Sequence, residues 1–95
     1  MKPLWKLRSG KFAGWQKEAA LYDATGKHVG YFVGEFAYTL NGQYLGELYS
    51  PGWIGKRTHG APPPQGAKVG YAPIASRPQV DRIGRAVDRW DDPEF

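Results

Sequence analysis

Short runs of alternating apolar and polar residues fill residues 1–57, and most of the turns between them contain a glycine. The segment LYDATGKHVGYF, residues 21–32, is followed sixteen positions later by AYTLNGQYLGEL, residues 37–48. The alternation predicts β-strands, and a polar residue followed by glycine is typical of a tight hairpin turn. The sequence therefore encodes a repeated β-hairpin, and the fixed period of this repeat is the main structural signal.

Two glycines mark each copy, one at the turn and one four residues later in the outgoing strand. The turn glycines are expected to adopt positive φ, a conformation that glycine reaches without steric cost. The second glycines predict a close approach by another group, which we expect to be an aromatic ring from a neighbouring unit. In the fourth copy the turn has eight extra residues. The glycine pairs are Gly10 and Gly14, Gly26 and Gly30, Gly42 and Gly46, and Gly66 and Gly70.

The slot before each second glycine is always aliphatic, so it is predicted to face the core. Its occupants are Ala13, Val29, Leu45 and Val69. On the incoming strands, the matching slots hold Trp5, Leu21, Ala37 and Trp53. The next residues, in the same order, are Lys6, Tyr22, Tyr38 and Ile54. A lone hairpin is only marginally stable in water, so the copies must bury their apolar faces against one another.

We therefore predict an all-β fold of four β-hairpin repeats around a pseudo-four-fold axis. The expected repeat domain covers residues 1–72, with units at about 4–16, 20–33, 36–49 and 53–72. Residues 73–95 form a tail that contains proline and arginine and is partly extended. Within it, Val80, Ile83, Val87 and Trp90 fall at helical spacing, which predicts a short amphipathic helix over residues 80–90. This helix either docks on the repeat body, which we favour, or folds on a partner.

Composition narrows the class of protein. The 95 residues suit one domain, and the lack of cysteine excludes a disulfide framework and thiolate chemistry. No stretch reads as a signal peptide or membrane span, so a cytoplasmic location is expected. The net charge is +4, and residues 1–60 hold eight Lys/Arg against four Asp/Glu, whereas residues 61–95 hold five of each. The excess positive charge thus lies on the repeat body.

Catalytic chemistry has no support in the sequence. His28 occupies the slot that Phe12 and Tyr44 fill in two other copies, and His59 lies in the proline-rich loop. Two separated histidines make neither a metal site nor an acid–base pair, and the carboxylates are scattered over links and turns. We expect no enzyme activity, no cofactor and no metal.

Basic residues interleaved with aromatic ones are the sequence's best candidates for binding. Grooves of this composition hold single-stranded nucleic acid, although core rings beside solvated lysines would give the same pattern, and we favour that simpler interpretation. The candidates are Lys11, Trp15, Lys27, Tyr31, Lys56 and Arg57.

The repeats resemble the bacterial four-fold beta-flower domain family, in which four hairpins pack around a pseudo-four-fold axis. The resemblance is carried by the glycine pairs, the strands Val29-Gly30-Tyr31 and Tyr44-Leu45-Gly46, and the segment Gly52-Trp53-Ile54. It covers roughly residues 3–72, with the enlarged fourth turn as a departure from the pattern. The resemblance implies a fold and brings no established activity.

We predict a non-catalytic interaction or structural module with a protein partner, using the ring face or the loop from Lys56 to Gln65. The alternative is binding of nucleic acid or an anionic surface by the basic body. An enzyme is a third, disfavoured interpretation, and self-association through the tail is a further one.

Overall fold

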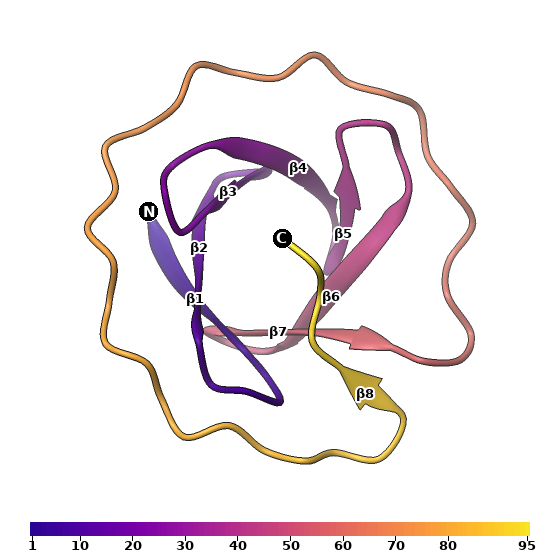
Figure 1. Cartoon of the computed structure of the whole chain (residues 1–95). Helices are drawn as coiled ribbons and strands as arrows, with labels where there is room; N and C mark the ends of the chain where they lie inside the picture. The colour runs from indigo at the N-terminus through magenta and orange to yellow at the C-terminus, as the bar shows by residue number, and fades with distance from the viewer.

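The structure is a computed structural model that describes residues 1–95, and it contains eight β-strands and no helix. The strands are β1 (Lys2–Lys6), β2 (Phe12–Lys17), β3 (Ala20–Asp23), β4 (His28–Val33), β5 (Phe36–Thr39), β6 (Tyr44–Ser50), β7 (Trp53–Arg57) and β8 (Trp90–Asp91). Strands β1 to β7 pair successively and antiparallel, and β7 also pairs with β1. The first seven strands therefore form a closed ring, seen along its axis in Figure 1.

The closing pair, β1 with β7, is the parallel pair of the ring. It joins Trp5 to Trp53 and Lys6 to Ile54, and Trp5 N–H donates to the Gly52 carbonyl at 2.8 Å. β1 and β7 are each the first strand of their own repeat, so the two strands run in the same direction. Closure matters because it removes the open sheet edges that would otherwise pair with other chains.

Each of the three complete hairpins contains a β-bulge at the same place. In β1/β2 the pairing steps from Leu4–Gly14 to Trp5–Phe12, so that Ala13 has no partner, and Val29 and Leu45 are skipped in the same way. A bulge bends the strand and increases its twist, which curves the hairpins into a ring. Ala13 and Leu45 lie in the core, and Val29 packs against it.

The core is small and consists of one apolar side chain or two from each unit. Its members are Leu4, Ala13, Leu21, Phe32, Ala37, Leu45 and Ile54. The prediction for the incoming strands was off by one residue in the first and fourth units, where Leu4 and Ile54 replace Trp5 and Trp53. The first turn is one residue longer than the next two, and β6 bulges at Tyr49. A shift of one residue exchanges the two faces of a strand.

The second glycines of the first three pairs, Gly14, Gly30 and Gly46, contact backbone, whereas the sequence suggested a ring. A Cβ on Gly14 would lie 1.9 Å from the Tyr22 carbonyl oxygen, and one on Gly30 would lie 2.2 Å from the Tyr38 oxygen. These distances are far below van der Waals contact. The repeated glycine therefore lets the next unit's strand approach closely.

The predicted fourth hairpin lacks its return strand, which is a correction to the unit at residues 53–72. Gly66 and Gly70 lie in an extended segment outside any strand, and Val69 is 89% exposed instead of buried. The edge of β7 is already occupied, by β1 at its start and by β8 at Lys56 and Arg57. No edge is left for residues 66–71.

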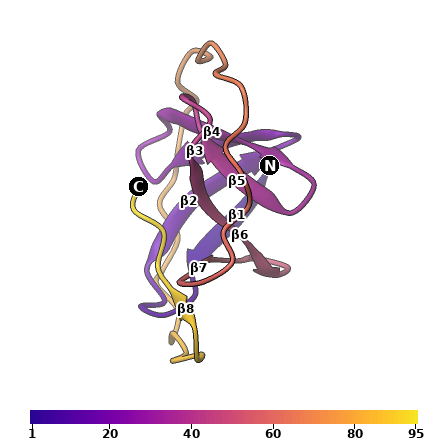
Figure 2. The ribbon, with the colours of Figure 1, turned by 90° about the vertical axis from the view of Figure 1, so that its right-hand side faces the viewer.

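Residues 58–89, which we call the belt, run in an extended path around the outside of the ring (Figure 1), and Figure 2 shows them edge-on. The belt is fastened at each hairpin turn by a backbone hydrogen bond to the turn glycine. Gln65 N donates to Gly42 O at 2.8 Å, Ile74 N to Gly26 O at 2.9 Å, and Arg82 N to Gly10 O at 2.7 Å. The turn glycines thus have two roles, because they adopt positive φ and also touch the belt.

The helix predicted over residues 80–90 was wrong. Val80 and Ile83, two members of its expected buried stripe, are 88% and 93% exposed. The amides of Arg82 and Arg85 donate to Gly10 O and Leu7 O, so they are not available for helical hydrogen bonds. Gly84 would also weaken a helix, and the ring offers the extended backbone better partners than a ten-residue helix offers itself.

After β8 the chain turns inward, and residue 95 lies over the centre of the ring in Figure 1. Pro93 is fully buried, and Phe95 packs against the core. Lys6 Nζ donates to the Phe95 carbonyl at 3.0 Å. The molecule is a disc with Cα extents of 33 × 32 × 18 Å, and this last segment covers one of its faces.

Candidate interaction site

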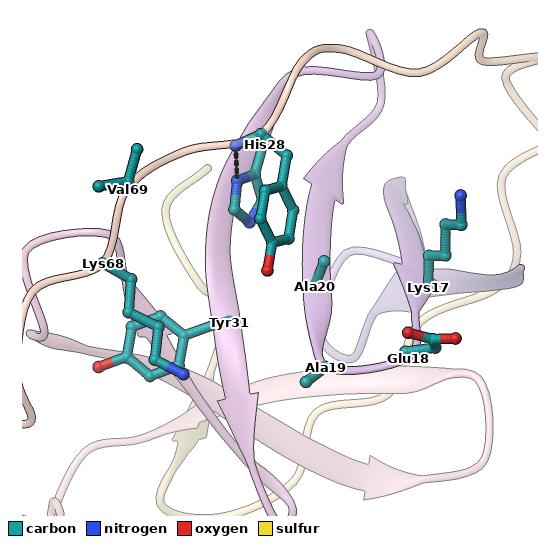
Figure 3. A pocket seen from close by; sticks show the side chains of 9 residues that line it. Lys17, Glu18, Ala19, Ala20, His28, Tyr31, Lys68 and Val69 are labelled. Atoms are coloured by element: carbon teal, nitrogen blue, oxygen red, sulfur yellow. Dashed lines mark hydrogen bonds between the residues drawn. The ribbon is translucent and has the colours of Figure 1, made fainter.

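A cavity of about 400 Å³ lies where the belt crosses the second hairpin (Figure 3). The turn between β2 and β3 forms one wall, β4 forms another, and belt residues 68–71 form the third. Its lining residues are Lys17, Glu18, Ala19, Ala20, His28, Tyr31, Lys68, Val69 and Tyr71. The site therefore combines two tyrosines, one histidine, two lysines and one carboxylate.

His28 anchors the belt at this cavity. Its ring stacks on Tyr71 with centroids 4.8 Å apart and packs against Tyr22 at 5.2 Å. Nδ1 accepts a hydrogen bond from the Tyr71 amide at 2.7 Å, drawn as a dashed line in Figure 3. Nδ1 must therefore be unprotonated, which places the ring hydrogen of the neutral imidazole on Nε2. That nitrogen is buried and has no partner in the chain.

Tyr31 is a second anchor. Its hydroxyl donates to the Gly66 carbonyl, its ring stacks with that of Tyr38, and Lys68 Nζ lies 4.3 Å from the centroid of the Tyr31 ring. Such a cation–π contact contributes modestly to stability. The aromatic residues of this cavity are thus already engaged in holding the belt.

The other predicted binding residues do not converge. Lys11 and Lys27 are exposed in equivalent places on two different hairpins. Trp15 is half-buried, and its Nε1 donates to Ser76 Oγ of the belt at 2.9 Å. Of the six predicted residues, the cavity includes only Tyr31.

Arg57 has a structural partner, the buried carboxylate of Glu47. Its Nε lies 2.8 Å from Oε1 and its Nη2 donates to Oε2 at 2.9 Å, which is the bidentate geometry typical of strong arginine–carboxylate pairs. The hydrogen bond to Glu47 raises the pKa of Arg57 above its ordinary value, and the charge of Glu47 adds to this. Arg57 is therefore committed to the fold, and its neighbour Lys56 pairs with Asp91 in the β7/β8 ladder.

Tyr44 completes this cluster. Its hydroxyl donates to Glu47 Oε1 at 2.9 Å and accepts from the Arg57 amide at 3.0 Å. Burial raises the pKa of Tyr44 to about 12, and the hydrogen bond to Glu47 acts in the same direction against the opposing effect of the Arg57 amide. The phenol stays neutral at physiological pH and serves as a hydrogen-bonding link.

The described residues 1–95 include no group of three or more His, Cys, Asp or Glu side chains placed to hold a metal ion. His59 lies in the exposed loop and contacts the hydroxyl of Thr58. No helix in the structure has the length and apolar character needed to cross a membrane.

The sequence did not predict a second set of cation–π contacts, which lies where the belt crosses the first hairpin. Arg82 lies over Trp5, and Arg82 and Arg85 both lie close to Trp53. The predicted helix over residues 80–90 rested on its apolar residues and gave these arginines no role. An Arg-x-x-Arg spacing in an extended, glycine-containing segment was the available signal.

A comparison with protein families finds a match over residues 7–83 to a family described as "4-fold beta flower protein". The match includes strands β2 to β7 and most of the belt. No curated protein and no solved structure matches the chain.

Proposed function

The chain belongs to the 4-fold beta flower family, and we propose that it is a non-catalytic interaction module whose belt is the surface offered to a protein partner. The ring supplies the rigid support, and the belt carries the contacting side chains. The absence of catalysis, the protein partner and a cytoplasmic location are all parts of this proposal.

The observation that carries the proposal is the orientation of the belt. Its amides bond inward to the hairpin turns, and it leaves large apolar side chains exposed to solvent. Four of them are more than two-thirds exposed, namely Val69 at 89%, Tyr71 at 68%, Val80 at 88% and Ile83 at 93%. Apolar side chains gathered on one segment are typical of a protein interaction surface.

Affinity capture with matched variants tests this surface. The belt variant carries Val80→Ser and Ile83→Ser, and the control carries Val33→Ser and Tyr49→Ser, which remove two exposed apolar side chains from the ring. We expect proteins captured by the wild type to be retained by the control and lost by the belt variant. Equal capture by the two variants, each with an unchanged melting temperature, would contradict the proposal.

A second candidate function, binding of an anionic polymer such as nucleic acid, is favoured by one observation. The Arg57–Glu47 pair is the single ion pair of the chain, which leaves the other twelve lysines and arginines without a carboxylate partner. Unpaired cations supply the sequence-independent part of nucleic-acid affinity.

Self-association through the tail stays a prediction. The tail already lies against its own ring, with hydrogen bonds at three hairpin turns. A second copy would therefore have to bind the belt's outer side or displace it. The solution mass measured with and without the two serine substitutions in the belt distinguishes this from capture of a different protein.

A further inference from the structure

We propose that Arg82 and Arg85, together with Trp5 and Trp53, form a phosphate-binding site for single-stranded nucleic acid. This inference rests on the second of the two functions proposed above and gives it a location. The location differs from the residues that the sequence alone indicated.

The geometry of Arg82 is the first argument. Its guanidinium carbon lies 3.5 Å from the centroid of the Trp5 ring system and 5.6 Å from that of Trp53. At the shorter distance the guanidinium is in direct contact with the indole, and such a contact restrains the side chain. A guanidinium that uses its face for a ring still has N–H groups in its plane with which to bind an anion.

Arg85 extends the site. Its guanidinium carbon lies 5.9 Å from the centroid of the Trp53 ring, so both arginines are close to the same half-buried indole. Along an extended chain, residues three apart are separated by about 10 Å. A strand with a phosphate on every nucleotide offers an anion to each of the two arginines.

The backbone around these arginines is fixed before any ligand binds. The amides of Arg82 and Arg85 bond to the first hairpin turn at 2.7 and 2.8 Å. Trp5 Nε1 donates to Val80 O at 2.9 Å, and the Phe12 amide donates to Asp81 Oδ1 at 2.8 Å. Positioning of this kind lowers the entropy cost of binding.

Neither guanidinium group has an acceptor within the chain, and this distinguishes the pair from Arg57. Arg57 also lies near two rings, Phe36 and Trp90, each at 5.8 Å, yet its donors are taken by Glu47. The carboxylate nearest in sequence to Arg82, that of Asp81, is held by the Phe12 amide. Arg82 and Arg85 therefore keep their donors for an external anion.

Single-stranded nucleic acid fits this site better than an acidic peptide does. Exposed Arg77 and Arg89 lie on the same belt, one to either side of the site, with exposed Asp88 between Arg85 and Arg89. Bases stack on guanidinium planes and on aromatic faces. Trp5 is buried beneath Arg82, so the surfaces present for stacking are the guanidinium planes and the half-buried Trp53. An acidic peptide has carboxylates to match the arginines but lacks a base on each unit that could stack on the guanidinium groups and the ring.

The test is a fluorescence-anisotropy titration of the full chain with labelled oligothymidylate and oligouridylate at several salt concentrations. The site variant is Arg82→Gln with Arg85→Gln. The matched control is Lys11→Gln with Lys27→Gln, which removes the same charge from exposed positions on two hairpins. We expect the site variant to bind about tenfold more weakly or worse, and the control to change by about twofold or less. The slope of log affinity against log salt should also fall by about 1.4 for the site variant, at roughly 0.7 per lost phosphate contact.

A second measurement on the wild type guards against variants that fail to fold. The four indole N–H signals in an NMR spectrum report on Trp5, Trp15, Trp53 and Trp90. We expect the oligonucleotide to shift those of Trp5 and Trp53 and to leave those of Trp15 and Trp90 in place.

Two results would overturn the inference in distinguishable ways. If the wild type does not bind the oligonucleotides even at low salt, nucleic-acid binding itself fails. If it binds but both double variants lose affinity equally, or Trp15 and Trp90 shift instead, binding is real and the site is wrong. Equally tight, arginine-dependent binding of a polyglutamate peptide or of anionic vesicles would show that nucleic acid is not the preferred ligand.

Discussion

The ring and the belt are stabilised in different ways. The ring buries seven apolar side chains in one cluster, and its strands pair with each other in a closed ladder. The belt has no strand until β8, and most of its side chains are exposed. It is held by backbone hydrogen bonds at three turns and by side chains of the ring, including Trp5, Trp15, His28 and Tyr31.

Although the ring and the belt are stabilised differently, some of the same residues stabilise both of them. The turn glycines close the hairpins and also bond to the belt, while aromatic residues that looked like binding candidates act as anchors. Elements with few buried contacts open more readily than a packed core. We therefore expect the belt to depend on the ring much more than the ring depends on the belt.

The largest effect is expected from a cavity in the ring. Leu21 is fully buried in the core, so Leu21→Ala should lower the free energy of unfolding by about 2–5 kcal/mol. Urea denaturation measures the change, with Val33→Ala on the exposed face of β4 as the control. Hydrogen exchange should accelerate in the ring and the belt together, and belt amides that kept their protection would contradict the dependence.

A smaller and more local effect is expected at the fastening of the belt. Gly26 has φ +92°, and an added Cβ would meet the Ile74 carbonyl oxygen at 2.1 Å, whereas Gly34 has φ +61° and no atom within 4 Å of that position. Gly34→Ala should therefore cost only the backbone penalty of about 1–2 kcal/mol, and Gly26→Ala should cost more. Native-state hydrogen exchange should show faster exchange of the Ile74 amide in Gly26→Ala alone, and similar behaviour of the two variants would show that the belt is not held at this turn.

The smallest effect is expected from acid at the same turn. Partial burial raises the pKa of the Asp23 carboxyl, but hydrogen bonds from Thr25 and from the Lys27 amide outweigh it, and the net pKa lies below its usual value. Asp23 therefore stabilises the fold above its ordinary pKa, and this contribution is lost as the pH falls through the lowered value. Solvent screening keeps it under about 1 kcal/mol.

Thermal melts of the wild type and Asp23→Asn check this prediction. The wild type should be more stable at neutral pH, and the gap should close at acid pH, as the pH falls through the lowered pKa of the folded-state carboxyl. A gap that is the same at both pH values would assign the effect to geometry and not to ionisation.

The period of the sequence predicted the three complete hairpins. Local turn chemistry and strand alternation act over a few residues, so the turns at Gly10, Gly26 and Gly42 could be read directly. The aliphatic slot predicted the inward position of Leu45. It did not predict the β-bulge that places this side chain there. The off-by-one error at Leu4 arose because an extra residue in the first turn leaves the glycine spacing unchanged, and the one at Ile54 arose because β6 bulges at Tyr49.

Residues after Arg57 could not be read in this way. Gly66 and Gly70 repeat the glycine pattern, and Val80, Ile83, Val87 and Trp90 repeat a helical one, yet neither element forms. Each pattern indicates the secondary structure that its segment could form in isolation. The ring instead offers acceptors at three turns, which an extended chain reaches and a helix does not.

The sequence by itself therefore determined the hairpin, because a hairpin's contacts join residues that are close along the chain. Only the tertiary structure decided that β7 would pair with β1, that the remaining chain would encircle the ring, and that Arg82 and Arg85 would meet Trp5 and Trp53. Those contacts join residues that are far apart in the chain. Their geometry exists only once the ring has closed.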